Sequence, residues 1–229
     1  MKIALELQPC CGKRSGIGHY TYELARHLES RNGVEFCGNL FNFLGRNDNT
    51  AALRGITIPI QENRLFPYGI YRRIWNIVPI PYSDLYRNGA DAAIFFNYIV
   101  PPHIKGHVLT FIHDMTYLRC PETMAAKNLR RIEKNIQYSV ERSSRVLTIS
   151  AFSKGEIAEL LGVPAEKISV VYPAPSLQPG TADFGVCCQK WGLHRPYLLY
   201  VGTIEPRKNL ARLLRAFALL KEKYRIPHQ

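Results

Sequence analysis

Short apolar runs alternate with amphipathic helical patterns along most of the chain. The first run, Lys2–Leu7, predicts a buried strand, and a polar loop containing glycines follows it as far as Gly18. Apolar residues then recur three and four positions apart, which predicts an amphipathic helix that ends near Asn32-Gly33. The members of this stripe are Ile17, Tyr20, Leu24 and Leu28. Further apolar runs predict strands over Val34–Phe41, Ile56–Ile60, Asp91–Phe96, His107–Ile112, Arg145–Ile149, Ile168–Tyr172 and Tyr197–Val201.

Two patterns between these runs predict further helices. Leu129, Ile132, Ile136 and Val140 form one apolar stripe within a helix expected over Glu122–Arg142. A shorter helix, Ser153–Leu161, opens with Ser153 and has Glu156 three positions later, which is the signature of a capping box. Because strands alternate with helices, we expect an α/β fold with a mostly parallel sheet and helices on both of its faces.

The composition changes at Tyr172–Gly180, where three prolines and a glycine occur in nine residues. Such a stretch is typical of an extended linker. One predicted strand and a helix over Asn209–Tyr224 follow it, which is too little to close a second hydrophobic core. We therefore expect a complete first domain over residues 1–175, a linker over 176–195, and the first strand–helix unit of a truncated second domain over 196–229.

The composition is that of an ordinary globular protein, with 229 residues of which 46% are hydrophobic and 21% charged. This excludes a disordered tail, a collagen-like repeat and a disulfide-stapled miniprotein. Lys and Arg outnumber Asp and Glu by 30 to 18, giving a net charge of +12. That surplus indicates an anionic partner: nucleic acid, an anionic membrane surface or a phosphorylated small molecule. Composition leaves the three alternatives open.

The cysteines and the hydropathy pattern bear on location. The six cysteines lack the spacing of a zinc site, and their scatter is typical of thiols in a reducing cytosol. The apolar run at the N-terminus is too short for a secretory signal. No window reaches the roughly 20 apolar residues of a membrane-spanning helix. We expect a soluble cytoplasmic protein, at most peripheral to a membrane.

A glycine-containing loop, Ser15–Thr21, lies between the first predicted strand and its helix. Glycines there let the backbone approach a phosphate, and the helix N-terminus adds unpaired N–H groups. The pattern differs from a dinucleotide fingerprint, because Thr21 occupies the third glycine position and Glu35 falls at the start of the second strand. A phosphate contact and a plain flexible turn both stay open at this point.

His113 and Asp114 directly follow the predicted strand His107–Ile112. In open α/β sheets, the carboxyl ends of the strands border the crevice that binds ligands. His113 is suited there to orienting a hydroxyl group, and Asp114 to holding the loop that follows. The alternative is that His113 is a structural histidine whose hydrogen bonds are satisfied at the strand end.

Arg207 and Lys208 lie between the predicted strand Tyr197–Val201 and the last helix. A bidentate cation, a point charge and the dipole of a helix N-terminus together suit a diphosphate group. Asn209 is expected to cap the helix. The alternative is a pair of solvated loop charges.

Basic and aromatic residues interleave over Arg64–Arg87. Three interpretations compete: a hydrophobic core, a lipid interface, and stacking on nucleic-acid bases. The helical spacing of Tyr71, Trp75 and Val78 favours the core. The basic residues are Arg64, Arg72, Arg73 and Arg87, and the aromatic ones also include Phe66, Tyr68, Tyr82 and Tyr86. On the long helix, a solvated face is expected to carry Lys127, Arg130, Arg131 and Lys134.

Taken in order, these segments resemble glycosyltransferase family 4 with the GT-B architecture, in which two Rossmann-like domains face each other across a cleft. The matching segments are residues 16–21, 97–102, 112–115, 148–154, 170–173 and 200–210. The last of these is the most specific, and together they span nearly the whole chain. The resemblance implies a Rossmann-like parallel sheet in the first domain.

The resemblance also implies transfer of a sugar from a nucleoside-diphosphate sugar to a glycan or lipid-linked acceptor, with retention at the anomeric carbon and without a metal or other cofactor. It implies that His113 and Asp114 are catalytic. The donor phosphates would be bound by Gly16, Gly18, Arg207 and Lys208. The acceptor side would carry His19, Tyr20, Asn97 and Tyr98. The block Glu205–Asn209 favours mannose as the sugar, and the basic surface favours the inner face of a membrane.

The sequence departs from the family pattern in one respect, because the Glu-x7-Glu segment that holds the donor's sugar and ribose would fall after Gln229. We therefore expect residues 1–229 alone to bind donor weakly, to transfer little or no sugar, and to self-associate through the apolar face of the last helix. The competing hypothesis is a non-catalytic basic module that binds nucleic acid or anionic lipid. The resemblance favours the transferase, with no nucleic-acid partner. No motif calls for pyridoxal phosphate or a second cofactor, which disfavours a phosphorylase or an epimerase.

Overall fold

The computed structural model describes residues 1–28, 33–86, 89–175, 180 and 183–229. These residues fall into two units, and each is considered by itself. The first unit comprises residues 1–119 and 126–174, and the second comprises 120–125 and 175–229. The first unit contains the sheet and every candidate site residue except Arg207 and Lys208.

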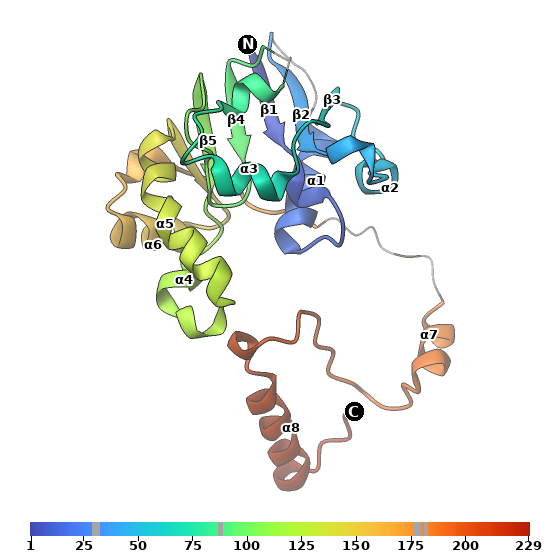
Figure 1. The fold of residues 1–229 in the computed structure, drawn as a ribbon. Coiled ribbons are helices and arrows are strands. Elements are labelled where there is room, and N and C mark those ends of the chain that lie inside the picture. The colour runs from blue at the N-terminus through green and yellow to red at the C-terminus, as the bar shows by residue number, and fades with distance from the viewer. Residues whose placement is uncertain (29–32, 87–88, 176–179, 181–182) are drawn as a thin grey trace. The chain divides into compact units, whose positions relative to one another are not determined.

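A seven-stranded sheet forms the centre of the described part of the first unit (Figure 1), in the order β3-β2-β1-β4-β5-β6-β7. All six strand pairs are parallel. The strands are β1 (Lys2–Glu6), β2 (Glu35–Phe41), β3 (Ile60–Asn63), β4 (Ala92–Phe95), β5 (His107–Phe111), β6 (Arg145–Thr148) and β7 (Ile168–Val170). The predicted Rossmann-like α/β fold is confirmed. The strand order changes direction between β1 and β4, which makes that point the topological switch of the sheet.

Helices connect these strands. In the first unit they are α1 (Gly16–His27), α2 (Thr50–Leu53), α3 (Tyr68–Ile74), α4 (Thr116–Arg119), α5 (Ala126–Arg142) and α6 (Ala151–Leu161). The second unit holds α7 (Phe184–Trp191) and α8 (Leu210–Tyr224). None of the described helices has the length and apolar character that crossing a membrane requires. All six cysteines are described, and none of them forms a disulfide.

Alternate residues of the strands enter two hydrophobic clusters, as the period-two geometry of a strand requires. Ala4, Ala93 and Val108 belong to one cluster, whereas their neighbours Leu5 and Ile94 belong to the other. The first cluster is covered by α3 and the segment after it, and the second by Tyr20, Leu24 and Leu28 of the predicted apolar stripe. Each face of the sheet is therefore buried, which explains why its strands are almost continuously apolar.

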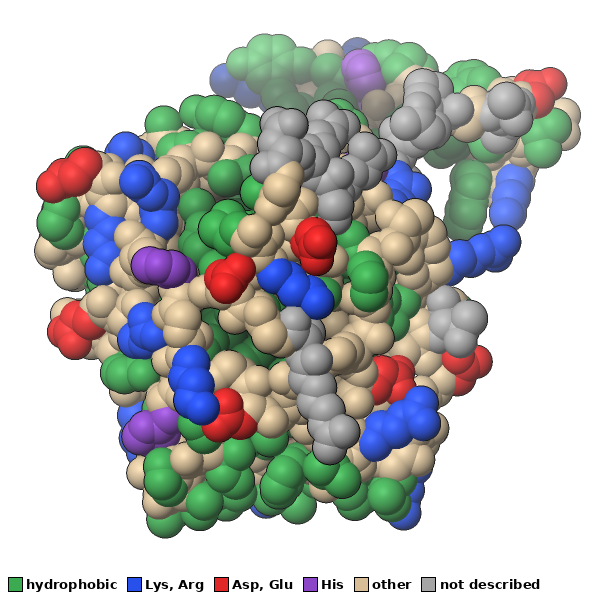
Figure 2. All heavy atoms as spheres, turned by 90° about the horizontal axis from the view of Figure 1, so that it is seen from above, with side chains coloured by type: hydrophobic (Ala, Val, Ile, Leu, Met, Phe, Trp, Pro, Cys, Tyr) green, Lys and Arg blue, Asp and Glu red, His purple; other side chains and the backbone are tan. Residues whose placement is uncertain are grey.

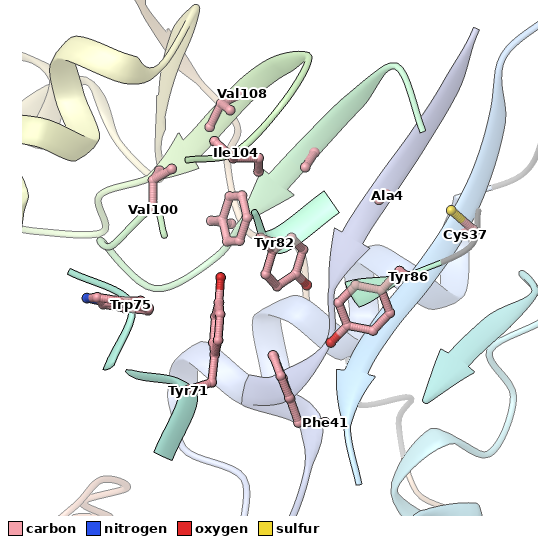
Figure 3. Close-up of a cluster of buried hydrophobic side chains, with 12 residues drawn as sticks. Ala4, Cys37, Phe41, Tyr71, Trp75, Tyr82, Tyr86, Val100, Ile104 and Val108 are labelled. Carbon is pink, nitrogen blue, oxygen red and sulfur yellow. The ribbon is translucent and has the colours of Figure 1, made fainter. Parts of the chain in front are cut away.

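Aromatic rings fill the first cluster (Figure 3). Phe41 stacks on Tyr71 with ring centroids 5.2 Å apart, and Trp75 meets Tyr71 edge-on at 5.8 Å. Tyr82 and Tyr86 are buried beside them. The core interpretation of the aromatic residues in this segment is thus confirmed. It is wrong for Val78, which is 41% exposed. The predicted basic residue Arg87 lies outside the described residues.

Several element boundaries differ from those predicted. The strand expected over Ile56–Ile60 lies later, because β3 begins only at Ile60, where the ladder with Gly38 of β2 starts. The helix expected from Glu122 begins at Ala126, since Met124 is extended and separates it from a short 3-10 turn at Pro121–Thr123. The other strands of the sheet are one or two residues shorter than predicted. The end of the first helix near Asn32-Gly33 was predicted too late, because α1 ends at His27 and Leu28 is extended.

Of the two predicted helix caps, Ser153 is wrong, whereas Asn209 is confirmed in its position but makes no side-chain cap bond. The N-cap of α6 is Ser150, whose side chain accepts a hydrogen bond from the backbone N–H of Ser153. Ser153 therefore lies inside the first turn, and its hydroxyl is engaged elsewhere. Asn209 does stand at the N-cap of α8, but it has a left-handed backbone with φ of 51° and makes no side-chain cap bond. That conformation differs from the extended one that places a capping side chain over the helix end.

The second unit differs from the sequence prediction in two places. The segment Tyr197–Val201 forms no strand in the described residues. A strand depends on hydrogen bonds to a neighbouring strand. The described residues of this unit contain no strand that could pair with this segment. Conversely, α7 lies within residues 176–195, where only a linker was expected. Residues 176–179, 181 and 182 of that range lie outside the described residues.

Candidate functional site

The polar residues predicted for the site follow the carboxyl ends of neighbouring strands in the first unit. Gly16 and Gly18 lie on the connection after β1, Asn97 and Tyr98 follow β4, and His113 follows β5. Strands β1 and β4 are neighbours at the switch point, and β5 is next to β4. This edge is where open parallel sheets bind their ligands.

His113 is buried and is held through one ring nitrogen. Nε2 lies 2.8 Å from the carbonyl oxygen of Phe96, so it carries the proton and donates it, which leaves Nδ1 as a hydrogen-bond acceptor. Burial lowers the pKa of His113 below its usual value, and this outweighs the raising effects of the Phe96 carbonyl and of Asp114. The imidazole is therefore neutral near pH 7. The interpretation of His113 as a structural histidine explains the hydrogen bond of Nε2. It does not explain Nδ1, which remains available to accept a hydrogen bond.

Asp114 joins the loops that follow β4 and β5. Its Oδ1 accepts hydrogen bonds from the hydroxyl of Tyr98 and from the backbone N–H of Thr116, both at 3.0 Å. Tyr98 has a φ of 62°, a left-handed conformation that is strained for an aromatic residue. Strain of this kind persists only where the surroundings hold it, and it is common at ligand sites. The carboxylate thus fixes the loop that begins α4 and contributes to holding Tyr98.

Tyr20 on α1 packs against the same histidine. Its ring meets those of Phe111 and His113 edge-on, with centroids 5.3 and 5.5 Å away. Its hydroxyl donates to the carbonyl of Val171 at 3.1 Å, and burial raises the pKa of this hydroxyl to about 12. Tyr20 therefore ties α1 to the ends of β5 and β7 and forms one wall around the imidazole.

The two glycines of the first loop have different environments. A Cβ atom on Gly18 would lie 2.3 Å from the carbonyl oxygen of Pro9, so only glycine lets α1 approach the loop after β1 this closely. A Cβ atom on Gly16 would meet nothing within 4 Å. Gly16 and His19 are exposed at the first turn of α1, and Ser15 caps this helix by accepting from the N–H of Gly18 at 3.4 Å. The exposed first turn leaves backbone N–H groups accessible to an anion.

Ser153 has a role that the sequence analysis missed. Its Oγ donates to the backbone carbonyl of His113 at 3.0 Å, and the hydroxyl of Ser150 in turn donates to Ser153 at 3.0 Å. A Ser at the start of a helix is expected to cap it, so the sequence offered no signal for this long-range bond. The first turn of α6 therefore positions the backbone of His113.

A cavity of about 140 Å³ opens at the ends of β1 and β4. Asn97 is the one predicted site residue that lines it, and its charged lining consists of Glu6, Arg72 and Arg131. The prediction that Arg131 lies on a solvated helix face is wrong, because its Nε is buried without a hydrogen-bond partner among the described residues. The helical pattern alone does not show that α5 turns this arginine toward the sheet.

Arg207 and Lys208 belong to the second unit. They lie in a 3-10 turn, Pro206–Lys208, directly before α8. The guanidinium of Arg207 makes an ion pair of 2.7 Å with Glu205, and Lys208 is exposed. Their position before a helix N-terminus agrees with the predicted local geometry, and their role in binding a diphosphate stays a prediction.

The distribution of charged side chains on the face drawn in Figure 2 bears on the hypothesis that the chain binds nucleic acid. Figure 2 shows the side at which β1 begins in Figure 1, and there basic and acidic side chains are interspersed among apolar ones. Proteins that bind nucleic acid usually gather basic residues on one face. This face does not show such a concentration.

The family assignment rests on a match that spans most of the first unit. The sequence model of Glycosyltransferase Family 4 matches residues 14–178, which include the first turn of α1, His113 and the start of α6. The chain belongs to glycosyltransferase family 4. The resemblance found in the sequence is thereby confirmed, and the Rossmann-like sheet of this family 4 chain agrees with it.

A curated relative extends the similarity beyond the family match. The chain is 29% identical over 239 aligned positions to the O-antigen chain mannosyltransferase B of Escherichia coli. The alignment covers 96% of this chain and 60% of the relative. The family 4 chain thus spans about 60% of the length of the relative it matches.

Proposed function

We propose that this family 4 chain is the acceptor-side part of a retaining glycosyltransferase. The transferred sugar is a hexose, with mannose the first candidate, and it passes from a nucleoside-diphosphate sugar to a glycan or lipid-linked acceptor. The observation that supports this most directly is His113, a neutral imidazole at the carboxyl end of β5 in a chain of this family. Similarity to a mannosyltransferase favours mannose.

In this proposal, Nδ1 of His113 accepts a hydrogen bond from a hydroxyl of the transferred sugar or of the acceptor. A neutral imidazole suits this role because an imidazolium has no free acceptor nitrogen. Asp114 keeps the surrounding loops in place through Tyr98 and Thr116. His19, Tyr20 and Asn97 complete the acceptor side.

The departing diphosphate needs positive partners, because negative charge develops on its bridging oxygen as the bond to the sugar breaks. We assign this role to the first turn of α1, where Gly16 and Gly18 let the backbone approach the phosphates, and to the side chains of Arg207 and Lys208. A guanidinium binds two phosphoryl oxygens at once, and an ammonium adds a point charge. Replacement of Arg207 by Ala should reduce turnover far more than acceptor binding.

The proposed activity is tested by transfer of labelled sugar. Because residues 1–229 alone are expected to transfer little or no sugar, a polypeptide that carries them together with a complete nucleotide-binding domain is incubated with GDP-mannose, UDP-glucose or ADP-glucose and with lipid-linked glycans. The product's anomeric configuration is determined by NMR. We expect transfer from one donor with retention, and its loss in the His113→Ala variant. Inversion, or no transfer from any nucleotide sugar, would contradict the proposal.

Donor binding and the organisation of the chain have separate tests. We propose that residues 1–175 form the acceptor-side domain and that 196–229 belong to the nucleotide-binding domain. Calorimetric titration of residues 1–229 with nucleotide sugars should then give weak binding. Micromolar affinity would refute this division.

Self-association is proposed through the last helix. Within the second unit, α8 exposes Leu213, Leu214 and Leu220, and self-association through this helix should appear in light scattering across a concentration series.

Contact with the inner face of a membrane is also proposed. The segment that contains α3 exposes apolar side chains beside arginines: Leu65 is 78% and Ile77 80% exposed, and Arg64 and Arg73 are exposed too. Apolar and basic residues together favour an anionic lipid surface. Co-sedimentation with phosphatidylglycerol vesicles should fall in a Leu65→Ser/Ile77→Ser variant, and a Leu118→Ser variant serves as the exposed apolar control. If the Leu65→Ser/Ile77→Ser variant and the Leu118→Ser variant sediment equally with the vesicles, the proposed membrane contact is contradicted.

A further inference from the structure

The cavity at the ends of β1 and β4 brings together charges from three separate elements. Glu6 is the last residue of β1, Arg72 lies on α3 and Arg131 on α5. The volume of about 140 Å³ is enough for a phosphoryl group, since a cavity of about 150 Å³ in another protein holds a molecule as large as benzene.

The charges lining this cavity are unbalanced. Burial raises the pKa of Glu6 to about 8, and the hydrogen bond from the Gln8 backbone and the two guanidinium groups only partly oppose that effect. Glu6 is therefore mostly protonated near pH 7, and the lining then carries two positive charges. Burial, aided by the charge of Arg72, lowers the pKa of Arg131, which still stays protonated.

The two guanidinium groups are prepared for an anion. Nε of Arg131 is buried with no hydrogen-bond partner among the described residues. The guanidinium of Arg72 lies over the ring of Tyr68, 5.2 Å from its centroid, which restrains its position. Arg72 and Arg131 are both partly buried, and partly desolvated cations without a paired anion carry a cost that a bound anion would reduce.

We propose that this cavity binds a phosphoryl group of the acceptor, with Arg72 and Arg131 as its cationic partners and Glu6 donating a hydrogen bond to a phosphoryl oxygen. The inference rests on the proposed sugar transfer, and it assigns a phosphorylated acceptor to it. Guanidinium groups match the oxygens of a phosphate in pairs, whereas a neutral sugar would leave both charges uncompensated. Asn97, which lines the same cavity, connects it to the acceptor side.

Proton binding by Glu6 gives the site a distinctive pH dependence. A protonated Glu6 donates to a phosphoryl oxygen, whereas an ionised Glu6 repels it. The other ionisable groups lining the cavity are Arg72 and Arg131, which stay charged, and the phenols of Tyr68 and Tyr82, whose pKa values burial raises. Affinity should therefore fall as the pH rises through about 8, the pKa of Glu6.

The experiment uses dimethyl diphosphate, a diester whose charge stays constant over this pH range. Calorimetric titration of the chain should show binding near pH 7. Arg72→Gln and Arg131→Gln should each weaken it by about tenfold or more, the loss expected for a hydrogen bond to a charged group. Arg73→Gln and Arg130→Gln are the matched controls, because these exposed arginines are sequence neighbours on the same two helices. They should change affinity less than about twofold.

The pH arm repeats the titration near pH 7 and pH 9. Wild-type affinity should fall by about tenfold, since one further pH unit above the pKa of about 8 ionises most of Glu6. The Glu6→Gln variant should bind equally at both values. Equal loss of affinity in the cavity variants and their controls, or a wild-type affinity independent of pH, would overturn the inference. Circular dichroism of every variant confirms that the fold is retained.

Two further probes distinguish the sources of the phosphoryl group. A short prenyl diphosphate stands for a lipid-linked acceptor, and a hexose 1-phosphate for a sugar-phosphate acceptor. The probe whose binding depends on Arg72 and Arg131 identifies the source, and dependence in neither would overturn the inference. These readouts involve no sugar transfer. Transfer is measured separately, in the polypeptide with a complete nucleotide-binding domain. If the phosphoryl probes do not bind as expected but that polypeptide transfers sugar, only this inference is removed. If the probes bind but that polypeptide transfers no sugar, the proposed function is contradicted.

Discussion

Ser153 Oγ donates a hydrogen bond of 3.0 Å to the backbone carbonyl of His113. The two residues are 40 positions apart, on the first turn of α6 and directly after β5. The imidazole of His113 is fixed on its other side by the carbonyl of Phe96. Both ends of the histidine are thus held by groups from neighbouring strand connections, which sets the orientation of the imidazole before any ligand binds.

Removal of the Ser153 hydroxyl tests its positioning role. In a polypeptide that includes a complete nucleotide-binding domain, we expect Ser153→Ala to reduce kcat of sugar transfer by about fivefold with little change in KM. The loss of one hydrogen bond, worth about 1 kcal/mol, displaces His113 rather than removing it. Ser153→Thr keeps the hydroxyl and should restore most of the activity. If both variants lose the same activity, or if only KM changes, Ser153 has no such role.

The cap of α6 gives a contrasting prediction. Ser150→Ala removes the side chain that accepts from the N–H of Ser153, and it should lower the free energy of unfolding by about 1 kcal/mol. Urea denaturation measures this loss. Ser150→Asp retains an N-cap acceptor and should lose much less, so equal losses in the two variants would contradict the assignment of Ser150 as the cap.

Gly18 and Gly16 should respond very differently to the same substitution. Gly18→Ala places a Cβ atom 2.3 Å from the carbonyl of Pro9, so either the loop or α1 must shift. We expect a loss of about 1–3 kcal/mol in the free energy of unfolding, as for other overpacked sites. Gly16→Ala meets no atom within 4 Å and should cost almost nothing. Comparable losses at the two positions would show that α1 is not packed as described.

The buried His113 makes stability depend on pH. Its pKa is lowered in the folded protein, so the unfolded chain, with the usual value near 6.5, binds a proton first as the pH falls. This group's contribution to the free energy of unfolding is therefore complete above about pH 6.5 and is lost as the pH falls through the folded pKa. His113→Gln should show a smaller loss of the urea midpoint between pH 7.5 and pH 5. An identical loss in both proteins would contradict a buried neutral imidazole.

Glu6 produces the opposite dependence. Its pKa is about 8 in the folded protein and near 4.5 in the unfolded chain, so folding binds a proton between these values. The stability contribution is complete below about pH 4.5 and is lost as the pH rises towards 8. We expect Glu6→Gln to raise the urea midpoint relative to wild type at pH 8 and to leave it nearly unchanged at pH 5. A difference independent of pH would argue against burial of the carboxyl.

The predicted elements were reliable where a local pattern and the tertiary packing require the same residues. The stripe of α1 and the apolar strands agree with the structure, because both faces of the sheet are covered. Predictions were wrong where one local pattern permits two outcomes. Ser150 and Ser153 both suit the start of a helix, and the run at Tyr197–Val201 is a strand only with a neighbour to pair with.

The same distinction applies to the candidate site. His113 was predicted from its place after a strand, since parallel strands bring their carboxyl ends to one edge whatever their loops contain. Arg131 was assigned to a solvated face, because helical periodicity gives the side on which a residue lies and not the polar group that faces it.

By itself, the sequence determined the alternation of strands and helices, the parallel sheet, the order of the family motifs and the positions at which site residues leave the strands. These depend on interactions between residues that are close along the chain. Only the tertiary structure decided that Ser153 holds His113 and that Glu6, Arg72 and Arg131 share a cavity. Both arrangements join distant segments, and the protonation of Glu6 follows from the burial that this packing creates.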